Sequence, residues 1–397
     1  MEKSVNLLAQ CAREELMTRI IPFWQALRDD INGGYCGMVG YDLKKDWNAT
    51  KGCILNSRIL WFFSNAYQLL KSDFLLEDAR HAFNFLKMYC VDQEHGGVYW
   101  SQKYDGRVND STKHTYNQAF AIYALSSYYL ASNDPAALEL ALELFHLIET
   151  RCRDEVGFLE SFTTDYQMAP NGKLSENGVL AYRTMNTVLH VLEAYTELYR
   201  ACSYRPVADA LRRVLDLIRE KIYDHTRNRL NVFFDKDMTS IIDLESYGHD
   251  IEAAWLIDRA CFVLHDESYS EKMAIITTAL EQKTLNRAFT KSMLLNECCN
   301  GEIDATGIWW VQAEGIVGFI NAYLKDTSNT HYLNAACDVW SYICDHQIDD
   351  RPNSEWLWAI DENCRPIQSR PIVNEWKCPY HNGRMCFELI GRTEHAS

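Results

Sequence analysis

The sequence predicts an all-α protein, an (α/α)6 barrel of about twelve helices with short β-hairpins in its loops. Two observations support this prediction. One pattern recurs along the 397 residues, and each copy contains two apolar helical segments of different character. Repeats of this length build rings or superhelices of stacked helix pairs. Six copies that span nearly the whole chain favour a closed ring, so we expect a single domain over residues 1–397.

The first segment of each copy is amphipathic and ends in a polar turn with aspartate, which is followed by a short aromatic stretch. These segments span residues 13–27, 76–90, 137–152, 207–223 and 333–348. The turn aspartates are Asp30, Asp92, Asp154, Asp224 and Asp350, at spacings of 62, 62, 70 and 126 residues. The last spacing is about twice the others, so we expect a degenerate copy around residues 280–302.

The second segment of each copy carries little charge along its middle. These segments span residues 56–70, 116–130, 185–199, 247–264, 309–324 and 379–390. A helix that is apolar nearly all round is buried, which makes these the inner helices and the amphipathic segments the outer helices. Because outer and inner helices alternate, all inner helices run in one direction and their N-terminal ends meet at one mouth of the ring.

Polar and aromatic side chains interrupt the apolar pattern in the first turns of the inner helices. Burying so many polar groups is costly unless a ligand or a network satisfies them, so we predict a ligand site at this mouth. The candidates are Asn56, Arg58, Tyr116, Asn117, Gln118, Asn186, His190, His249, Glu252, Trp309, Trp310, Gln312, Glu314, Trp376, His381, Asn382 and Arg384.

The spacing of these candidates indicates acid–base chemistry. Glu252 follows His249 by three residues, so both can share a helix face, and a carboxylate beside an imidazole raises its basicity and fixes its tautomer. Tryptophan rings beside polar groups are suited to stacking on sugar rings. The alternative interpretation is structural: satisfied core histidines, tryptophans that pack the core, and Arg384 as a buried ion pair.

Composition excludes several classes of function. A net charge of −16 repels phosphate backbones, so nucleic acid is not an expected partner. No apolar run approaches the length of a membrane span, and no signal peptide is recognisable, so we expect a cytoplasmic protein with 14 reduced cysteines.

Metal and cofactor binding are not expected either. His190, His249, Glu252 and His381 could form a zinc-like set, but no HExxH motif or clustered Cys/His run supports it. Nucleotide-binding and serine-hydrolase motifs are also missing from the sequence. We therefore expect a reaction without metal or cofactor.

Four motifs carry a resemblance to a known family. They are NSRILW from Asn56, YGHDIEA from Tyr247, WWVQAE from Trp309 and WKCPYHNGR from Trp376. Together they resemble the cellobiose 2-epimerases of the N-acylglucosamine 2-epimerase superfamily, over the whole chain. The resemblance implies an (α/α)6 barrel and a cofactor-free epimerisation at C2. The reducing-end glucose of cellobiose, lactose or another β-1,4-linked disaccharide would become mannose through ring opening and a cis-enediolate.

The resemblance also implies roles for residues. His249 and His381 would be the acid/base pair on opposite faces of C2, Glu252 would orient His249, and Arg58 would stabilise the enediolate oxygen. His190 would assist ring opening. The implied substrate-binding residues are Tyr116, Asn186, Trp309, Trp310, Glu314 and Trp376.

Other functions remain open from the residues alone. A mannose 2-epimerase or an aldose–ketose isomerase would use the same enediolate and the same side chains. A glycoside hydrolase would need two carboxylates, for which Glu252 and Glu314 could serve, but it would leave three histidines unexplained. A barrel that only binds sugar or protein would show affinity without turnover. We expect a monomer.

Overall fold

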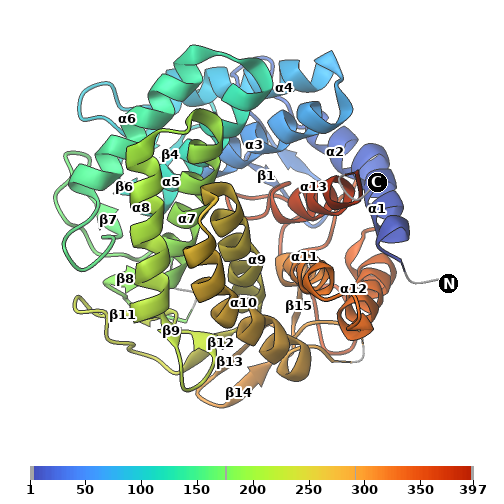
Figure 1. Cartoon of the computed structure of the whole chain (residues 1–397). Coiled ribbons are helices and arrows are strands. Elements are labelled where there is room, and N and C mark those ends of the chain that lie inside the picture. The colour runs from blue at the N-terminus through green and yellow to red at the C-terminus, as the bar shows by residue number, and fades with distance from the viewer. Residues whose placement is uncertain (1–3, 175–176, 291, 395–397) are drawn as a thin grey trace.

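The computed structural model describes residues 4–174, 177–290 and 292–394. Within these ranges twelve continuous helices form two concentric rings, which confirms the predicted (α/α)6 barrel (Figure 1). The outer helices are α1–η1–α2 (Val5–Glu15, Leu16–Ile20, Ile21–Gln25), α4–η2 (Asp73–Phe85, Leu86–Cys90), α6 (Pro135–Arg151), α8–η3 (Arg205–Leu217, Ile218–Ile222), α10 (Glu267–Arg287) and α12–η4 (Thr330–Tyr342, Ile343–Gln347). The η segments are π-helical turns.

The inner helices are α3 (Cys53–Leu70), α5 (Thr115–Ser132), α7 (Met185–Cys202), α9 (Tyr247–Leu264), α11 (Trp309–Lys325) and α13 (His381–Glu394). Their middles are buried on all sides, as the scarcity of charge predicts; in α5 every residue from Thr115 to Tyr128 is buried. The ring closes where α13 packs against α1, and both ends of the chain therefore lie on the same side of the molecule (Figure 1).

The fifth outer helix differs from its predicted position. We expected the degenerate copy around residues 280–302, but α10 spans Glu267–Arg287 and residues 297–304 belong to a hairpin. Asp266 begins the helix early, because its side chain accepts a hydrogen bond from the amide of Tyr269. The residues just after α10 contain no turn aspartate, so the repeat could not be aligned from sequence.

Two of the predicted turn aspartates are wrong by one residue. The buried carboxylates are those of Asp29 and Asp349, whereas Asp30 and Asp350 are exposed. Asp29 accepts hydrogen bonds from the amides of Ile31 and Asn32, the pattern that Asp92 repeats with the next turn. Two adjacent aspartates look alike in sequence, and only the one whose side chain points into the turn can bind these amides.

A buried lysine ties each of the first two turns to the inner helix that follows. The Lys51 Nζ lies 2.7 Å from Asp29 Oδ2, and the Lys113 Nζ lies 2.7 Å from Asp92 Oδ2. Both lysines are 0% exposed and stand just before α3 and α5. Although burial alone would raise it, the hydrogen bonds from Lys113 and two backbone amides lower the pKa of Asp92 to about 2.

Short strands join neighbouring copies of the repeat. The strand before each of the first five inner helices pairs with a strand of the following copy, and Val39 bridges to Val373 to close the circle. The joining pairs are β3 (Lys51–Gly52) with β4 (Ser101–Gln102), β6 (Lys113–His114) with β7 (Ser161–Phe162), β8 (Arg183–Thr184) with β11 (Phe233–Phe234), β12 (Leu244–Ser246) with β13 (Glu297–Cys299), and β15 (Gly307–Ile308) with β16 (Ala359–Ile360). These links hold the starts of the inner helices in one circle.

The remaining strands form hairpins within a copy. They are β1 (Met38–Val39) with β2 (Lys45–Asp46), β5 (Val108–Asp110) on β4, β9 (Tyr223–Asp224) with β10 (Arg229–Leu230), and β14 (Glu302–Asp304) on β13. The predicted short hairpins are thus present, and they line the end of the barrel where the inner helices begin.

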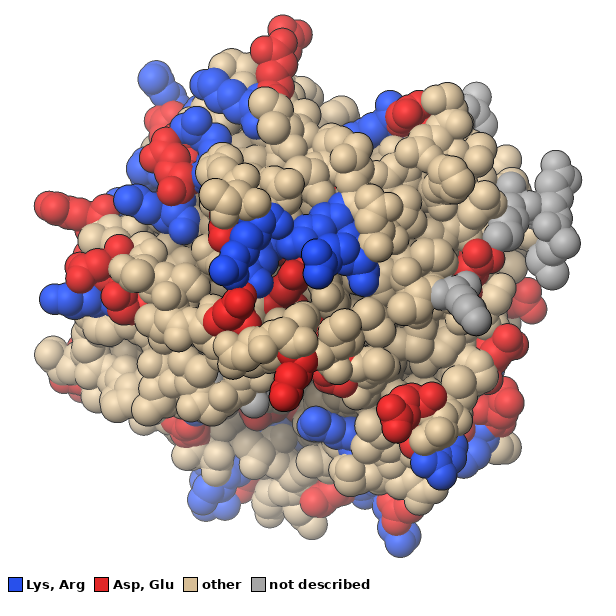
Figure 2. All heavy atoms as spheres, turned by 90° about the horizontal axis from the view of Figure 1, so that it is seen from below, with Lys and Arg blue, Asp and Glu red and all other residues tan. Residues whose placement is uncertain are grey.

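The outside of the barrel is charged with both signs. On the face drawn in Figure 2, acidic side chains are scattered, and basic side chains gather near the centre. None of the helices in the described residues combines the length and the apolar character that crossing a bilayer requires.

Replacing Lys113 by Met tests the buried ion pair. Lys113→Met leaves the Asp92 carboxylate buried without its cation, so we expect a loss of about 3–5 kcal/mol in the free energy of unfolding, measured with urea at pH 7. Lys44→Met is the matched control, because Lys44 pairs with Asp42 on the surface with an 87% exposed side chain, and no measurable change is expected. Equal effects of the two substitutions would contradict this account.

Candidate active site

Some of the polar residues at the start of the inner helices serve the fold. The Asn56 side chain binds backbone groups of its own copy, and the amides of Gln118 and Gln312 do the same. Gln118 bonds both the amide and the carbonyl of Val98, and Gln312 bonds both groups of Leu294 at 2.8 Å. These three side chains anchor the hairpins, so they are satisfied without a ligand.

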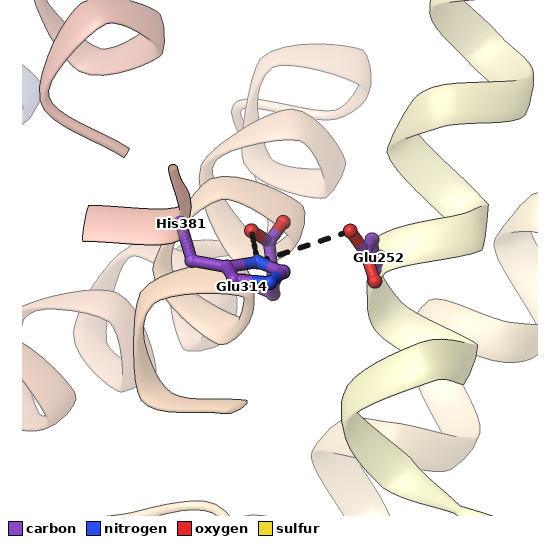
Figure 3. Close-up of side chains that lie close together, drawn as sticks. All are labelled: Glu252, Glu314 and His381. Carbon is purple, nitrogen blue, oxygen red and sulfur yellow. Dashed lines mark hydrogen bonds and ion pairs between the residues drawn. The ribbon is translucent and has the colours of Figure 1, made fainter. Parts of the chain in front are cut away.

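His381 lies at the start of α13 between two carboxylates from other inner helices. Its Nδ1 is 2.8 Å from Glu314 Oε1 of α11 and 3.9 Å from Glu252 Oε1 of α9, and Figure 3 shows both acids facing the ring. Burial lowers the pKa of His381 well below its usual value, while Glu252 opposes this shift. Because Nδ1 is engaged by Glu314, the Nε2 is the atom available for proton transfer.

Arg384 stands one helical turn after His381 and is 1% exposed. Its Nη2 binds Glu314 Oε1 at 2.7 Å and also binds Glu252, and its Nη1 binds Glu193 of α7. One guanidinium therefore pairs with carboxylates from three different inner helices. Burial of three acids around one cation is tolerated because each has a charge-assisted hydrogen bond.

His190 is held in the same way as His381. Its Nδ1 lies 3.0 Å from Glu193 Oε2, and the Tyr380 hydroxyl donates to the same oxygen at 2.5 Å. Burial acts to raise the pKa of Glu193, but Arg384 and His190 lower it to about 2, so this carboxylate stays ionised. The Nε2 of His190 is left free to face a ligand.

His249 has a different partner from the one expected. Its Nδ1 lies 2.7 Å from the Ser246 hydroxyl, whereas Glu252 binds Arg384 and lies beside His381. The expectation that Glu252 orients His249 is therefore wrong, because the guanidinium of Arg384 attracts the Glu252 carboxylate more strongly than a neutral imidazole does. Burial lowers the pKa of His249 to about 4.

Arg58 is buried in α3 among aromatic rings and has no carboxylate within ion-pair distance in the described part of the chain. Its Nη2 donates to the Tyr116 hydroxyl at 2.8 Å, its Nη1 donates to the Trp376 carbonyl at 3.1 Å, and its Nε has no hydrogen-bond partner. A buried cation without a counter-ion attracts negative charge, so Arg58 is prepared for an anionic ligand or intermediate.

Aromatic side chains surround the three histidines. The Trp310 ring centroid lies 4.8 Å from that of His249 and 5.5 Å from that of His381, so one indole contacts two imidazoles from different helices. Gly248 makes this packing possible, because a Cβ there would lie 2.6 Å from the Trp310 ring. Trp309 is buried beside His381, and Trp376 is half-buried beside Tyr116.

Several buried polar atoms near these rings have no hydrogen-bond partner among the described residues. They include the Oδ1 of Asn186, one helical turn before His190, the Oε2 of Glu252 and the Nε1 of Trp309. Such atoms are costly to bury unless something binds them, and sugar hydroxyls can donate to the two oxygens and accept from the indole. All three support the predicted ligand site.

Glu314 differs from its predicted role. We expected its carboxylate to bind a sugar hydroxyl, but Oε1 binds His381 and Arg384, and Oε2 accepts from the Trp255 indole at 3.0 Å. Both oxygens are thus occupied, and the residue is buried. Glu314 supports His381 from behind rather than facing a substrate.

Sequence reasoning missed Glu193 and Tyr380, and it left Arg384 open between a site residue and a buried structural ion pair. A signal for Glu193 was present, because it follows His190 by three residues, the spacing that drew attention to His249 and Glu252. The Tyr380 contact joins α13 to α7 across 187 residues of sequence. Only the closed ring reveals that contact.

The residues present do not fit a metal ion. Among the described residues, one group of potential ligands lies close enough together, namely Glu252, Glu314 and His381. Arg384 already binds both of these carboxylates, so a positive charge occupies the place that a cation would take. A divalent ion at this group would have to displace the guanidinium from both carboxylates and break two buried ion pairs.

The geometry defines a class of protein: an (α/α)6 barrel with histidine, arginine and tryptophan side chains for acid–base chemistry on a sugar. Comparison with known sequences identifies the family. Residues 34–381 match the N-acylglucosamine 2-epimerase family, and the chain belongs to it.

Individual relatives agree with this assignment. A cellobiose 2-epimerase of Eubacterium cellulosolvens is 47% identical over 394 residues, with 95% of this chain and 96% of that protein covered. The crystal structure of a sugar epimerase from a ruminal bacterium is 48% identical, with a TM-score of 0.96 and coverage of 97% and 99%. Cellobiose 2-epimerase from Bacillus thermoamylovorans is 42% identical, with a TM-score of 0.94 and coverage of 98% and 100%.

Zinc titration tests the metal argument. Arg384 fills the position that a metal ion would take in the Glu252–Glu314–His381 group. After dialysis against a chelator, added zinc should therefore not raise the thermal unfolding midpoint by binding to this group. The measurement is differential scanning fluorimetry of the wild type and of Glu252→Gln with and without Zn²⁺. A zinc-induced rise that the wild type shows and Glu252→Gln loses would contradict this account.

Proposed function

We propose that this protein catalyses the reversible epimerisation at C2 of the reducing-end glucose of cellobiose and related β-1,4-linked disaccharides, without metal or cofactor. The observation that carries the proposal is the placement of two imidazoles, His249 and His381, on one indole, with the uncompensated cation of Arg58 nearby in the same ring of helix starts. The family membership of the chain and the names of its relatives support the same reaction.

The reaction needs a base, an acid and a site for negative charge. After the sugar ring opens, a histidine Nε2 takes the proton from C2, the electron pair of the broken C–H bond forms the C1–C2 double bond, and the C1 oxygen becomes anionic. The second histidine, protonated at Nε2 by solvent, then gives this proton to C2 on the opposite face of the planar cis-enediolate, and the first histidine releases the proton that it took to solvent. The carbonyl at C1 is restored, and glucose has become mannose.

His249 and His381 are suited to these two proton transfers. The pKa of His249, about 4 because of burial, keeps this imidazole neutral and able to accept a proton at neutral pH. His381 has its Nδ1 bound to Glu314, which fixes the ring and leaves Nε2 for C2. In the return direction the two residues exchange roles.

Arg58 stabilises the enediolate in this proposal. Its guanidinium has no carboxylate partner and its Nε is unbonded, so it can donate to the anionic oxygen at C1 without first breaking an ion pair. A preorganised donor of this kind typically lowers the activation barrier by on the order of 3–4 kcal/mol. Its hydrogen bond to Tyr116 holds that hydroxyl beside the same oxygen.

The other residues bind the sugar and open its ring. His190, fixed by Glu193, takes the proton of the anomeric hydroxyl and passes it to the ring oxygen, which opens the ring. Asn186 binds a sugar hydroxyl. Trp309, Trp310 and Trp376 provide stacking surfaces for the two sugar rings. Glu314 acts on His381, because both of its oxygens are occupied within the protein. Glu252 lies beside His381 with one oxygen, and its other oxygen, which has no partner among the described residues, can accept a hydrogen bond from a sugar hydroxyl.

Several expectations about the whole protein stay predictions. They are a single catalytic domain over residues 1–397, a monomeric state, a cytoplasmic location and the absence of nucleic acid among its partners. Light scattering after size-exclusion chromatography measures the oligomeric state directly.

Proton NMR with cellobiose in D2O tests the proposed reaction. We expect a disaccharide with mannose at its reducing end, deuterium at C2, and full activity in the presence of chelator. His249→Asn and His381→Asn should each lower turnover by at least about a hundredfold, because each removes one proton-transfer group. His331→Asn, an exposed histidine of α12, is the control and should keep normal turnover. Free glucose as the product, or exchange seen only with mannose, would contradict the proposal.

The pH dependence of kcat/KM tests the assignment of His249 as a base. Protonation removes the base, so activity should hold from neutral pH downward and fall only as the pH drops through about 4. The measurement is initial rates of epimerisation across this range, with far-ultraviolet circular dichroism at each pH to show that the protein stays folded. An acid limb with its midpoint near pH 6.5, the ordinary pKa of histidine, would show that burial does not depress the pKa of His249.

A further inference from the structure

We propose that Arg384 is a positioning residue that couples His190 to His381, so that the orientation and tautomer of each imidazole depend on the other. The inference rests on the proposed function, because it assigns a further role in that same site. It assigns Arg384 no contact with substrate. The coupling follows from two hydrogen-bonded paths. Both start at the guanidinium of Arg384, and they end at His190 and His381.

The two paths are alike. On one side, Arg384 Nη1 binds Glu193, whose other oxygen lies 3.0 Å from His190 Nδ1. On the other side, Arg384 Nη2 binds Glu314 Oε1 at 2.7 Å, and that oxygen lies 2.8 Å from His381 Nδ1. Each imidazole thus meets a carboxylate at Nδ1, and each carboxylate meets the same planar cation.

The guanidinium favours the ionised form of the two carboxylates on these paths. Burial raises the pKa of Glu314 and Arg384 opposes this shift, while Arg384 and His190 together overcome burial and lower the pKa of Glu193 to about 2. Without the hydrogen bonds of Arg384, burial would favour a protonated glutamic acid on either path. A protonated glutamic acid donates a hydrogen bond instead of accepting one. It would then donate to Nδ1, and the neutral imidazole would hold its proton on Nε2, where it could no longer act as a base.

The rigid fork of arginine adds a geometric constraint. Its two Nη atoms lie in one plane at fixed separation, so Glu193 of α7 and Glu314 of α11 are held at a fixed distance from each other. A lysine would preserve the charge but could not hold both acids in this arrangement. Arg384→Lys therefore separates the positioning role from simple charge balance.

Arg259 offers a matched control from the same three helices. Arg259, a residue of α9, binds Glu388 of α13 and lies 3.6 Å from Glu197 of α7. Glu388 lies one helical turn after Arg384 in α13, and Glu197 lies one turn after Glu193 in α7. Both ion pairs of Arg259 join inner helices, as those of Arg384 do. No histidine lies on either acid in the described residues.

Nitrogen-15 NMR of the full-length, histidine-labelled protein without substrate is the decisive measurement. In the wild type we expect His190 and His381 to carry their proton on Nδ1, with His190→Asn and His381→Asn providing the assignments. In Arg384→Lys one ammonium cannot hold Glu193 and Glu314 in their places together, so the signals of both imidazoles should move from their wild-type positions, while Arg259→Lys should leave both unchanged. Unchanged signals in Arg384→Lys, or equal changes in both lysine variants, would overturn the proposal.

Two glutamine variants keep the test valid if Arg384→Lys fails to fold. Glu193→Gln removes the charge beside His190, and coupling predicts that the His381 signal also moves; Glu314→Gln should move the His190 signal in return. Changes confined to the directly bonded histidine in both variants would overturn the proposal. These readouts need no turnover, so a wild type that shows the coupling but does not epimerise cellobiose would contradict only the proposed function.

Kinetics then show whether the coupling matters for the reaction. In Arg384→Lys we expect kcat to fall about a hundredfold with little change in KM, because the proton-transfer groups lose their geometry while the stacking surfaces remain. The acid limb of its pH profile should also move relative to that of Arg259→Lys. A lower thermal midpoint with unchanged kcat and pH profile would indicate a merely structural role and overturn the proposal.

Discussion

The ion pairs of Arg384 are the interaction on which the candidate site depends. One buried guanidinium holds Glu193, Glu252 and Glu314, and these acids come from three inner helices that are far apart in sequence. Removing one member of such a group leaves uncompensated charge in the interior, which is far more costly than losing a surface pair. Glu193 and Glu314 also bind His190 and His381, so the same side chains stabilise the fold and contact the imidazoles of the candidate site.

The barrel makes this arrangement possible by fixing where each inner helix begins. Buried Asp–Lys pairs tie the outer turns to the starts of α3 and α5, and short strands connect each copy to the next until Val39 meets Val373. The functional side chains lie within the first turns of the inner helices. A shift of one helix along its axis would move its residue away from the guanidinium, so ring closure determines the geometry of the site.

Much of the fold could be predicted because it rests on local patterns. The inner helices are apolar all round and the turns carry aspartate, and both features are visible in consecutive residues. The fifth outer helix was misplaced because its turn lacks the aspartate, and Asp30 was mistaken for Asp29 because neighbouring aspartates differ only in orientation. The candidate site was predicted as a set, but not its pairings: spacing of three residues suggested His249 with Glu252, whereas the ring brings Glu252 to Arg384.

The charges of the site explain why its histidines are suited to act as bases. Arg384 binds Glu193, Glu252 and Glu314, so the carboxylates beside His190 and His381 are already engaged by a cation. Burial lowers the pKa values of His190, His249 and His381 below that of a free imidazole. Neutral imidazoles can accept a proton from C2, and Arg58, which has no carboxylate partner among the described residues, is the cation that remains for negative charge formed on the sugar.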